Sequence, residues 1–126
     1  MDFSAQRVRI PSDLVQQCLA SAGKTYALYG RDPENKAEFG VGKRNYNSIG
    51  GEAMWIDEIG RQRRFPTLED VAAATRLADA LPQITIAGAM ADPHEIPVAW
   101  RSVAVMSEML RNTTKPIIFF YHNRAS

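Results

Sequence analysis

The sequence predicts an α/β protein that contains the beginning of a parallel sheet. Two short, nearly continuous apolar segments, residues 84–90 and 117–121, have the composition of strands buried on both faces. An amphipathic segment of helical length, residues 98–111, lies between them. The two strands start about 30 residues apart, which is the usual length of a βαβ crossover. Together these observations favour two parallel strands joined by a helix.

Length and composition suit a single domain with a buried core, since the chain has 126 residues and 45% hydrophobic content. The net charge of +1 gives no indication of a nucleic acid or membrane partner. The single cysteine, Cys18, excludes an internal disulfide, and its helical spacing with Leu14 and Leu19 predicts a buried thiol. No signal sequence or apolar run of membrane-spanning length occurs. We therefore expect a soluble cytoplasmic protein.

Residues 1–66 are predicted to form a leading region that is helical and β-rich. Residues 7–10 alternate as a short edge strand, and Ser12 is the expected cap of a helix that ends at Gly23. The apolar residues of that helix share one face, so the helix is expected to dock on another element. They are Leu14, Val15, Cys18, Leu19 and Ala22.

Three short strands and a hairpin are expected next. The strand candidates are residues 25–29, 37–41 and 44–49. Residues 55–57 and 62–64 flank a turn in which Gly60 would supply a positive φ angle. The hairpin carries a small basic cluster, Arg61, Arg63 and Arg64, which we interpret as a solvated arm facing Asp57 and Glu58.

Residues 67–126 are predicted to form the first βα units of the sheet, continuous with the leading region in one incomplete domain. Thr67 and Asp70 have the spacing of a capping box at the start of a helix over residues 68–81. Pro82 marks its end. Its predicted buried stripe is Leu68, Val71, Ala74, Leu77, Ala78 and Leu81.

The second helix, over residues 98–111, follows the strand at 84–90 and a turn-rich loop. Asn112 is its expected carboxyl-terminal cap. Its predicted buried residues are Val98, Ala99, Val103, Met106 and Leu110. Two parallel strands leave apolar edges and faces open, which soluble proteins rarely tolerate. Either a partner covers these surfaces or the chain is part of a longer one.

The common catalytic and nucleotide-binding motifs are absent or incomplete. Gly40 to Lys43 lacks the first glycine of a phosphate-binding loop, and Arg44 stands where a magnesium-binding Ser or Thr is needed. The strand at 84–90 leads into only one glycine of a dinucleotide-binding loop. His94 and His122 lack ligand partners at a metal-site spacing, so no metal site is predicted.

The carboxyl ends of the two predicted strands are the best candidates for a site, because ligands of α/β folds bind there. Met90 and Asp92 follow the first strand, and His122 follows the second. Asp92 precedes Pro93, so it could instead serve only to start a turn. For His122 the favoured alternative is a surface or packing histidine.

Six strings in a fixed order make a more specific signal than any single motif. They are RIP at 9–11, ALYGRDP at 27–33, RR at 63–64 with TLED at 67–70, LADALP at 77–82, GAM at 88–90 and NTTKP at 112–116. On these strings the chain resembles the corrinoid-dependent trimethylamine methyltransferase family, from about residue 7 to residue 120. The resemblance implies a (β/α)8 TIM barrel preceded by a helical and β-rich region.

The resemblance also implies transfer of a methyl group from a methylated amine to Co(I) of a corrinoid. A partner protein would carry that corrinoid, and this chain would bind no cofactor directly. Met90, Asp92, Tyr121 and His122 are the residues best placed to line the substrate pocket, by the rule that barrel sites lie at the carboxyl ends of strands. No catalytic role is assigned to any of them.

Members of the family are several times longer than this chain, which is therefore expected to be an amino-terminal portion and inactive alone. The substrate stays open between trimethylamine and a quaternary amine such as glycine betaine, because the pyrrolysine that distinguishes the two groups would lie beyond residue 126. We also expect a homo-oligomer. The alternative hypothesis is a free-standing, non-catalytic binding or assembly module, which a sharp folded dimer in size-exclusion chromatography would favour.

Overall fold

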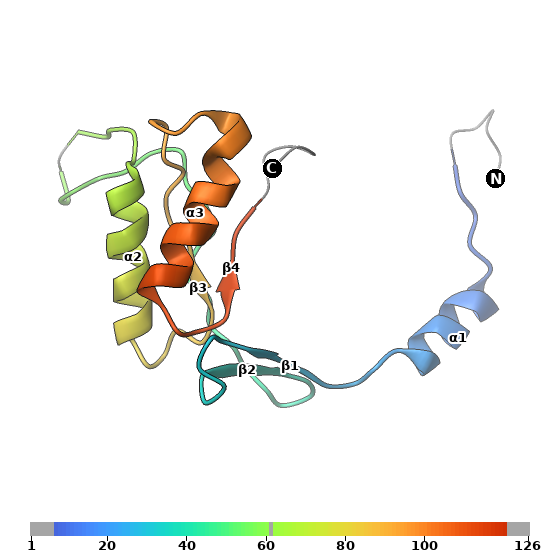
Figure 1. Cartoon of the computed structure of the whole chain (residues 1–126). Helices are drawn as coiled ribbons and strands as arrows, with labels where there is room; N and C mark the ends of the chain where they lie inside the picture. The colour runs from blue at the N-terminus through green and yellow to red at the C-terminus, as the bar shows by residue number, and fades with distance from the viewer. Residues whose placement is uncertain (1–6, 61, 121–126) are drawn as a thin grey trace.

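The structure is a computed structural model that describes residues 7–60 and 62–120. Its helices and strands follow one another along the chain as Figure 1 shows. They are α1 (Ser12–Ser21), β1 (Tyr26–Tyr29), β2 (Lys36–Phe39), α2 (Leu68–Ala80), β3 (Ala87–Gly88), α3 (Val98–Asn112) and β4 (Ile117–Ile118). Within the described residues, no helix combines the length and the apolar composition needed to cross a bilayer.

The two predicted strands pair in parallel, with Ala87 opposite Ile117 and Gly88 opposite Ile118. This confirms an α/β fold with a βαβ crossover through α3. Regular pairing is shorter than the apolar segments that predicted it, because β3 and β4 each span two residues. Nearby backbone groups bond to other parts of the chain. The strand pair is thus part of a wider layer.

A third segment, residues 46–49, runs parallel to β3 on the side away from β4. Asn47 forms a parallel bridge with Ile86, and Ser48 N donates to Ile86 O at 3.2 Å. The contact continues to the end of β3, where Met90 N donates to Ile49 O at 3.2 Å. We call residues 46–49, β3 and β4 together the parallel layer. Its three members lie side by side in their order along the chain.

Gly88 is needed because residues 46–49 run very close beside β3. A Cβ atom at Gly88 would overlap the backbone carbonyl oxygens of Ser48 and Ile49. The space is used by Ser48 Oγ, which accepts from Gly88 N at 2.6 Å and donates to Gly88 O at 3.4 Å. A serine hydroxyl thereby joins two strands whose backbones approach too closely for a larger residue.

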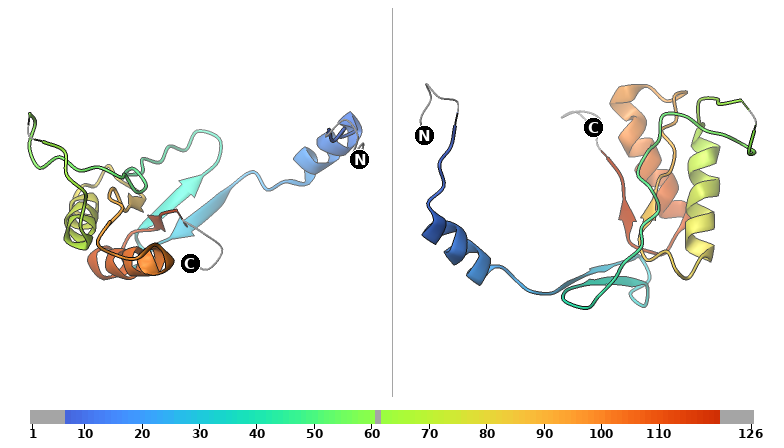
Figure 2. Two further views of the ribbon diagram at one scale, coloured as in Figure 1. Left: turned by 90° about the horizontal axis from the view of Figure 1, so that it is seen from above. Right: turned by 180° about the vertical axis from the view of Figure 1, so that it is seen from behind.

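Both crossover helices pack on one face of the parallel layer, where they contact each other along their length (Figures 1 and 2). Three alanines of the central strand, Ala87, Ala89 and Ala91, are at most 1% exposed and allow α2 and α3 to approach closely. The core cluster comprises Val71, Ala89, Ala91, Val105 and Met109. Burial of this apolar surface, at about 25 cal/mol per Å², is the main stabilising term of the unit.

The ends of α2 are fixed by side chains from neighbouring segments. The predicted capping box is confirmed, because Thr67 Oγ1 accepts from Asp70 N at 3.4 Å and Asp70 Oδ2 accepts from Thr67 N at 2.7 Å. At the other end, Lys115 Nζ donates to the carbonyl oxygens of Ala78 and Leu81, both at 2.8 Å. These bonds satisfy groups that a helix leaves without internal partners.

The antiparallel hairpin of β1 and β2 attaches to the turn between α3 and β4. Asn35 Nδ2 donates to Thr114 Oγ1 at 2.8 Å. Gly30 lies so close to this turn that a Cβ atom would overlap Thr114 O. The hairpin itself is held by a stacked pair, Tyr26 and Phe39, with ring centroids 4.4 Å apart. It therefore joins the amino ends of the strands, opposite the edge where a site was expected.

The amino-terminal segment differs from its prediction. No strand forms over residues 8–10, and α1 has Pro11 as its cap residue without a side-chain bond from Ser12. The helix buries none of its residues and lies apart from the other elements (Figures 1 and 2). The prediction of a buried Cys18 was wrong, since this thiol is exposed. Helical spacing identified an apolar face on α1, but it does not indicate whether another element packs on that face.

The buried faces of the two crossover helices were also partly mispredicted. In α2, Leu77 is 54% exposed and Leu81, its cap residue, 41% exposed, while Ala72 and Thr75 are buried. In α3 none of the large predicted residues is buried. The residues that face the layer are Arg101, Ser102, Val105 and Met109. The exposed apolar ones are Val98, Trp100, Val103, Met106 and Leu110.

The segments before α2 match their predictions in part. Trp55 and Arg64 form an antiparallel bridge, as the predicted hairpin requires, and Gly60 has a φ of +86° as expected. Arg61, part of the predicted basic cluster, lies outside the described residues. The strand candidate at residues 44–49 supplies the third member of the parallel layer, through the bridge of Asn47 with Ile86. The division at residue 66 stays a prediction. The layer nevertheless draws one of its members from before that position.

Candidate functional site

The three members of the parallel layer end at the same edge, and two hollows open there. Residues 46–49 lead into Gly50 and Gly51, β3 leads into Met90, and β4 leads into Phe119. Phe120 lies over Gly50, where an added Cβ atom would overlap the phenyl ring. This edge is formed by the carboxyl ends of the strands, which is where sites of parallel α/β proteins lie.

The first hollow is a small cavity between α3 and the strand ends. The space open to the centre of a water molecule is about 30 Å³. Most of its wall is apolar, and two polar side chains interrupt that wall. The lining residues are Gly51, Ala89, Ala91, Asp92, Ser102, Val105, Phe119 and Phe120.

The second hollow is an open groove of about 530 Å³ between α2 and residues 52–56. Met90 forms its end wall and has a φ of +57°, a left-handed conformation that costs a non-glycine residue about 1–2 kcal/mol. Such strain is retained where the surrounding structure fixes the backbone, often at functional positions. The other lining residues are Glu52, Met54, Trp55, Ile56, Ala73, Ala74 and Leu77.

Asp92 holds the loop after β3 against α3 through an ion pair with Arg101. Arg101 Nη1 lies 2.9 Å from Asp92 Oδ2, and Arg101 Nε donates to Ile96 O at 3.0 Å. Both side chains are mostly buried, at 10% and 14% exposure for Arg101 and Asp92. His94 lies nearby, stacked on Phe65 at a centroid distance of 4.3 Å. Asp92 thus has a structural role in addition to starting the turn.

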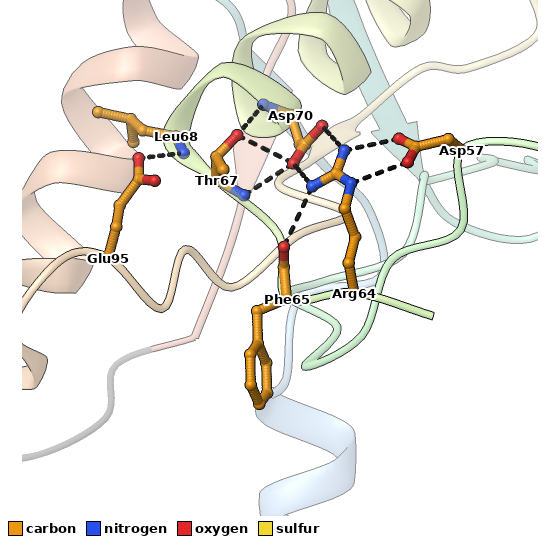
Figure 3. A network of polar contacts seen from close by, with 7 residues as sticks. All are labelled: Asp57, Arg64, Phe65, Thr67, Leu68, Asp70 and Glu95. Atoms are coloured by element: carbon orange, nitrogen blue, oxygen red, sulfur yellow. Dashed lines mark hydrogen bonds and ion pairs between the residues drawn. The ribbon is translucent and has the colours of Figure 1, made fainter. Parts of the chain in front are cut away.

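A polar network joins the 55–64 hairpin to the start of α2 (Figure 3). Arg64 lies between two carboxylates, with Nη2 2.6 Å from Asp57 Oδ1 and Nη1 2.7 Å from Asp70 Oδ2. Glu95 Oε1 accepts from Leu68 N at 2.9 Å on the other side of the helix start. Arg64 therefore belongs to a structural arm, as predicted, and the network fixes one wall of the groove relative to the loop that carries Asp92.

The Asp70 carboxylate is expected to make the stability of the fold decrease at acidic pH. Its bonds to Arg64, and further bonds from Thr67, lower its pKa from 3.8 to about 2 against the opposing effect of burial. A group with a depressed pKa stabilises the fold fully above its unfolded pKa, and this contribution is lost as the pH falls toward the folded value. We expect a loss of about 1–2 kcal/mol in the free energy of unfolding between pH 3.8 and about 2, measured by urea titration.

Two variants separate this effect from the titration of other acids. Asp70→Asn should remove the part of the pH dependence that belongs to the network and should also destabilise α2 at neutral pH. Glu69→Gln, on the same helical turn, changes an exposed ion pair with Arg76 and should retain the wild-type slope. Equal slopes for wild type and Asp70→Asn would contradict the assignment.

The structure describes two of the four predicted site residues, and it does not bring these two together. Met90 lines the groove and Asp92 lines the small cavity, so these two residues face separate hollows. Tyr121 and His122 lie outside the described residues. A role in substrate binding stays a prediction for all four. Among the described residues, no three His, Cys, Asp or Glu side chains gather in a way that could hold a metal ion.

Sequence reasoning missed several residues that shape this edge. Arg101 and Ser102 were not expected to face the layer, because polar residues rarely count toward a buried helical face. Trp55 and Glu52 were not expected near Met90, since their hairpin is distant in sequence. The adjacent glycines 50 and 51 were the available signal, as paired glycines after a strand often mark a close backbone approach.

Comparison with known proteins gives two related results. The family model described as trimethylamine methyltransferase (MTTB) matches residues 1–125. A trimethylamine methyltransferase, MttB, of Desulfitobacterium hafniense strain DSM 10664 / DCB-2 is 32% identical over 121 residues, which are 94% of this chain and 24% of that protein. A glycine betaine methyltransferase of D. hafniense strain Y51 is 31% identical over 111 residues, covering 87% of this chain and 23% of that protein.

These matches confirm the family that the six ordered strings indicated. They span nearly the whole chain, including the helices, the parallel layer and the loops at its carboxyl edge. The chain covers about a quarter of the length of the curated relatives that it matches. It belongs to the trimethylamine methyltransferase family.

Proposed function

We propose that the chain forms the opening part of a (β/α)8 barrel that moves a methyl group from a methylated amine to Co(I) of a corrinoid. The observation that carries this proposal is the family match over residues 1–125, with relatives named as trimethylamine and glycine betaine methyltransferases. The chain covers about a quarter of these relatives. Activity is therefore proposed for the polypeptide in which this segment works with the rest of such a barrel.

The arrangement of the parallel layer supports the barrel. A TIM barrel places successive parallel strands next to one another and keeps all its helices on the outer face. Residues 46–49, β3 and β4 are adjacent in chain order, and α2 and α3 share one face and one core cluster. The segment thus contains two consecutive βαβ units, which is the arrangement that the proposed barrel requires.

The chemistry requires a site where the methyl carbon meets its acceptor in line and water is excluded. A corrinoid held by a partner protein would supply Co(I), a nucleophile that would donate an electron pair to the methyl carbon, and the amine nitrogen would keep the electrons of the broken C–N bond. No residue of this chain is assigned to the corrinoid. The proposed contribution of the chain is a section of the pocket rim, formed after β3 by Met90 and Asp92 and after β4 by Tyr121 and His122.

The test uses the polypeptide encoded by the complete reading frame that contains these residues. It is mixed under anoxic conditions with a cognate corrinoid protein reduced to Co(I), and methyl transfer is followed by the change in the corrinoid spectrum. Trimethylamine and glycine betaine are tested in separate reactions, with ammonium as the control that carries no methyl group. We expect transfer from one of the two methylated amines.

The outcome separates substrate choice from the proposal itself. Transfer from trimethylamine alone or from glycine betaine alone would assign the substrate within the family. Transfer from neither compound, nor from other methylated amines, by a folded polypeptide would contradict a methyltransferase function. A non-catalytic assembly module would then be the better description.

A further inference from the structure

One buried hydroxyl group near the carboxyl edge of the layer has no partner. Ser102 lies on α3, is 1% exposed and faces the strands. Its Oγ atom makes no hydrogen bond to any part of the chain that the structure describes. A serine inside a helix commonly bonds to the carbonyl oxygen four residues earlier. Because burying an unpaired hydroxyl is costly, this one requires an explanation.

Ser102 lines the small cavity that also reaches Asp92. On the measure that counts the space open to a water centre, one water molecule needs at least about 10–15 Å³, and about 30 Å³ is present. A dry cavity of this kind is normally lined only by apolar groups. Two polar residues, Ser102 and Asp92, are among those that line this cavity, so it combines the space with the polar residues that a buried water requires.

We propose that the cavity holds one ordered water molecule that bridges Ser102 and Asp92. The water would donate one hydrogen bond to the Asp92 carboxylate, which has about four acceptor positions, and exchange another with Ser102 Oγ. Asp92 and Ser102 come from different elements, the loop after β3 and the middle of α3. The water is therefore a second attachment between them, in addition to the ion pair of Asp92 with Arg101.

This internal solvent site makes Ser102 a positioning residue for the rim of the layer. Arg101 holds Asp92 from one side, and the water would hold it from the interior of the cavity. The two attachments together would fix residues 91–97, the loop that follows Met90. The inference stands independently of methyl transfer, since it depends only on the contacts within this chain.

The test combines a high-resolution crystal structure with a pair of serine variants. In the wild-type crystal we expect a density peak within hydrogen-bond distance of both Ser102 Oγ and an Asp92 carboxylate oxygen. Ser102→Ala should remove this peak and lower the melting temperature by about 3–6 °C relative to Ser107→Ala. Ser107 is an exposed serine on the same helix, so its variant accounts for the change in helix propensity.

The sign of the thermal shift makes the inference falsifiable without the crystal. If no water is bound, Ser102 buries an unpaired hydroxyl, and its removal should raise the melting temperature above that of Ser107→Ala. Such a rise would overturn the proposal, and so would a crystal structure in which Ser102 Oγ bonds to Val98 O. A fall in melting temperature together with the water peak supports it.

Discussion

Replacing Gly88 by alanine is expected to lower the free energy of unfolding by about 3 kcal/mol or more. The added methyl group would overlap two backbone carbonyl oxygens, those of Ser48 and Ile49. Backbone atoms cannot turn aside as the end of a long side chain can. Residues 46–49 would have to move away from β3, which would break both hydrogen bonds between Ser48 and Gly88.

Urea unfolding followed by tryptophan fluorescence measures this effect. Gly23→Ala is the matched control, because an added Cβ atom at Gly23 meets nothing within 4 Å. That variant should be neutral or slightly stabilising, since alanine restricts the unfolded chain more than glycine does. Unfolding of both alanine variants at the same urea concentration would contradict the close approach of residues 46–49 to Gly88.

Replacing Arg101 by methionine is expected to cost about 2–3 kcal/mol of stability. The change keeps an unbranched side chain on α3 but removes the guanidinium from a mostly buried ion pair with Asp92. Breaking one side of such a pair leaves a carboxylate in a poorly solvated position, which costs more than the pair contributes when it is complete. The hydrogen bond to Ile96 O is lost as well.

A double-mutant cycle shows whether the loss belongs to the pair. Asp92→Asn in the Arg101→Met background should recover part of the lost stability, because the unpaired charge is then absent. Arg111→Met is the control on the same helix, since Arg111 is 74% exposed and lies 3.9 Å from Glu108. A loss at position 101 no larger than that at position 111 would show that the buried pair contributes little.

Local features of the fold could be predicted because their causes are local. The capping box needs only Thr67 and Asp70 three residues apart, and the structure forms it as expected. The turn at Gly60 depends on one residue that tolerates a positive φ angle. The parallel pairing of β3 and β4 followed from two apolar segments separated by one helix length.

The orientation of α3 could not be predicted, because this helix has apolar residues on more than one side. Periodicity favoured the side with Val103 and Met106, yet the layer contacts the side with Arg101 and Met109. Alanines of the central strand accept the small Ser102 there, and the ion pair with Asp92 accommodates the guanidinium. Both features depend on contacts between distant segments, which helical spacing does not contain.

Residues 44–49 were a strand candidate, but their parallel pairing with β3 was missed, for a different reason. Residues around Asn47 lack the run of β-branched and aromatic residues that indicates a buried strand. Their pairing with β3 rests on backbone bonds, on the Ser48 hydroxyl and on the absence of a side chain at Gly88. The sequence predicted the edge of the layer at which the candidate site lies, but not which residues share a hollow there. Of the four proposed residues, Met90 and Asp92 are described, and they face separate hollows.

The sequential order of the parallel layer has a consequence for synthesis on the ribosome. Each member pairs with the next one along the chain, at separations of about 30 to 40 residues. At a translation rate of about 5–20 residues per second, each strand waits roughly 2–8 seconds for its neighbour. The two pairings within the layer can therefore form one after the other as the nascent chain emerges, because each joins segments no more than about 40 residues apart.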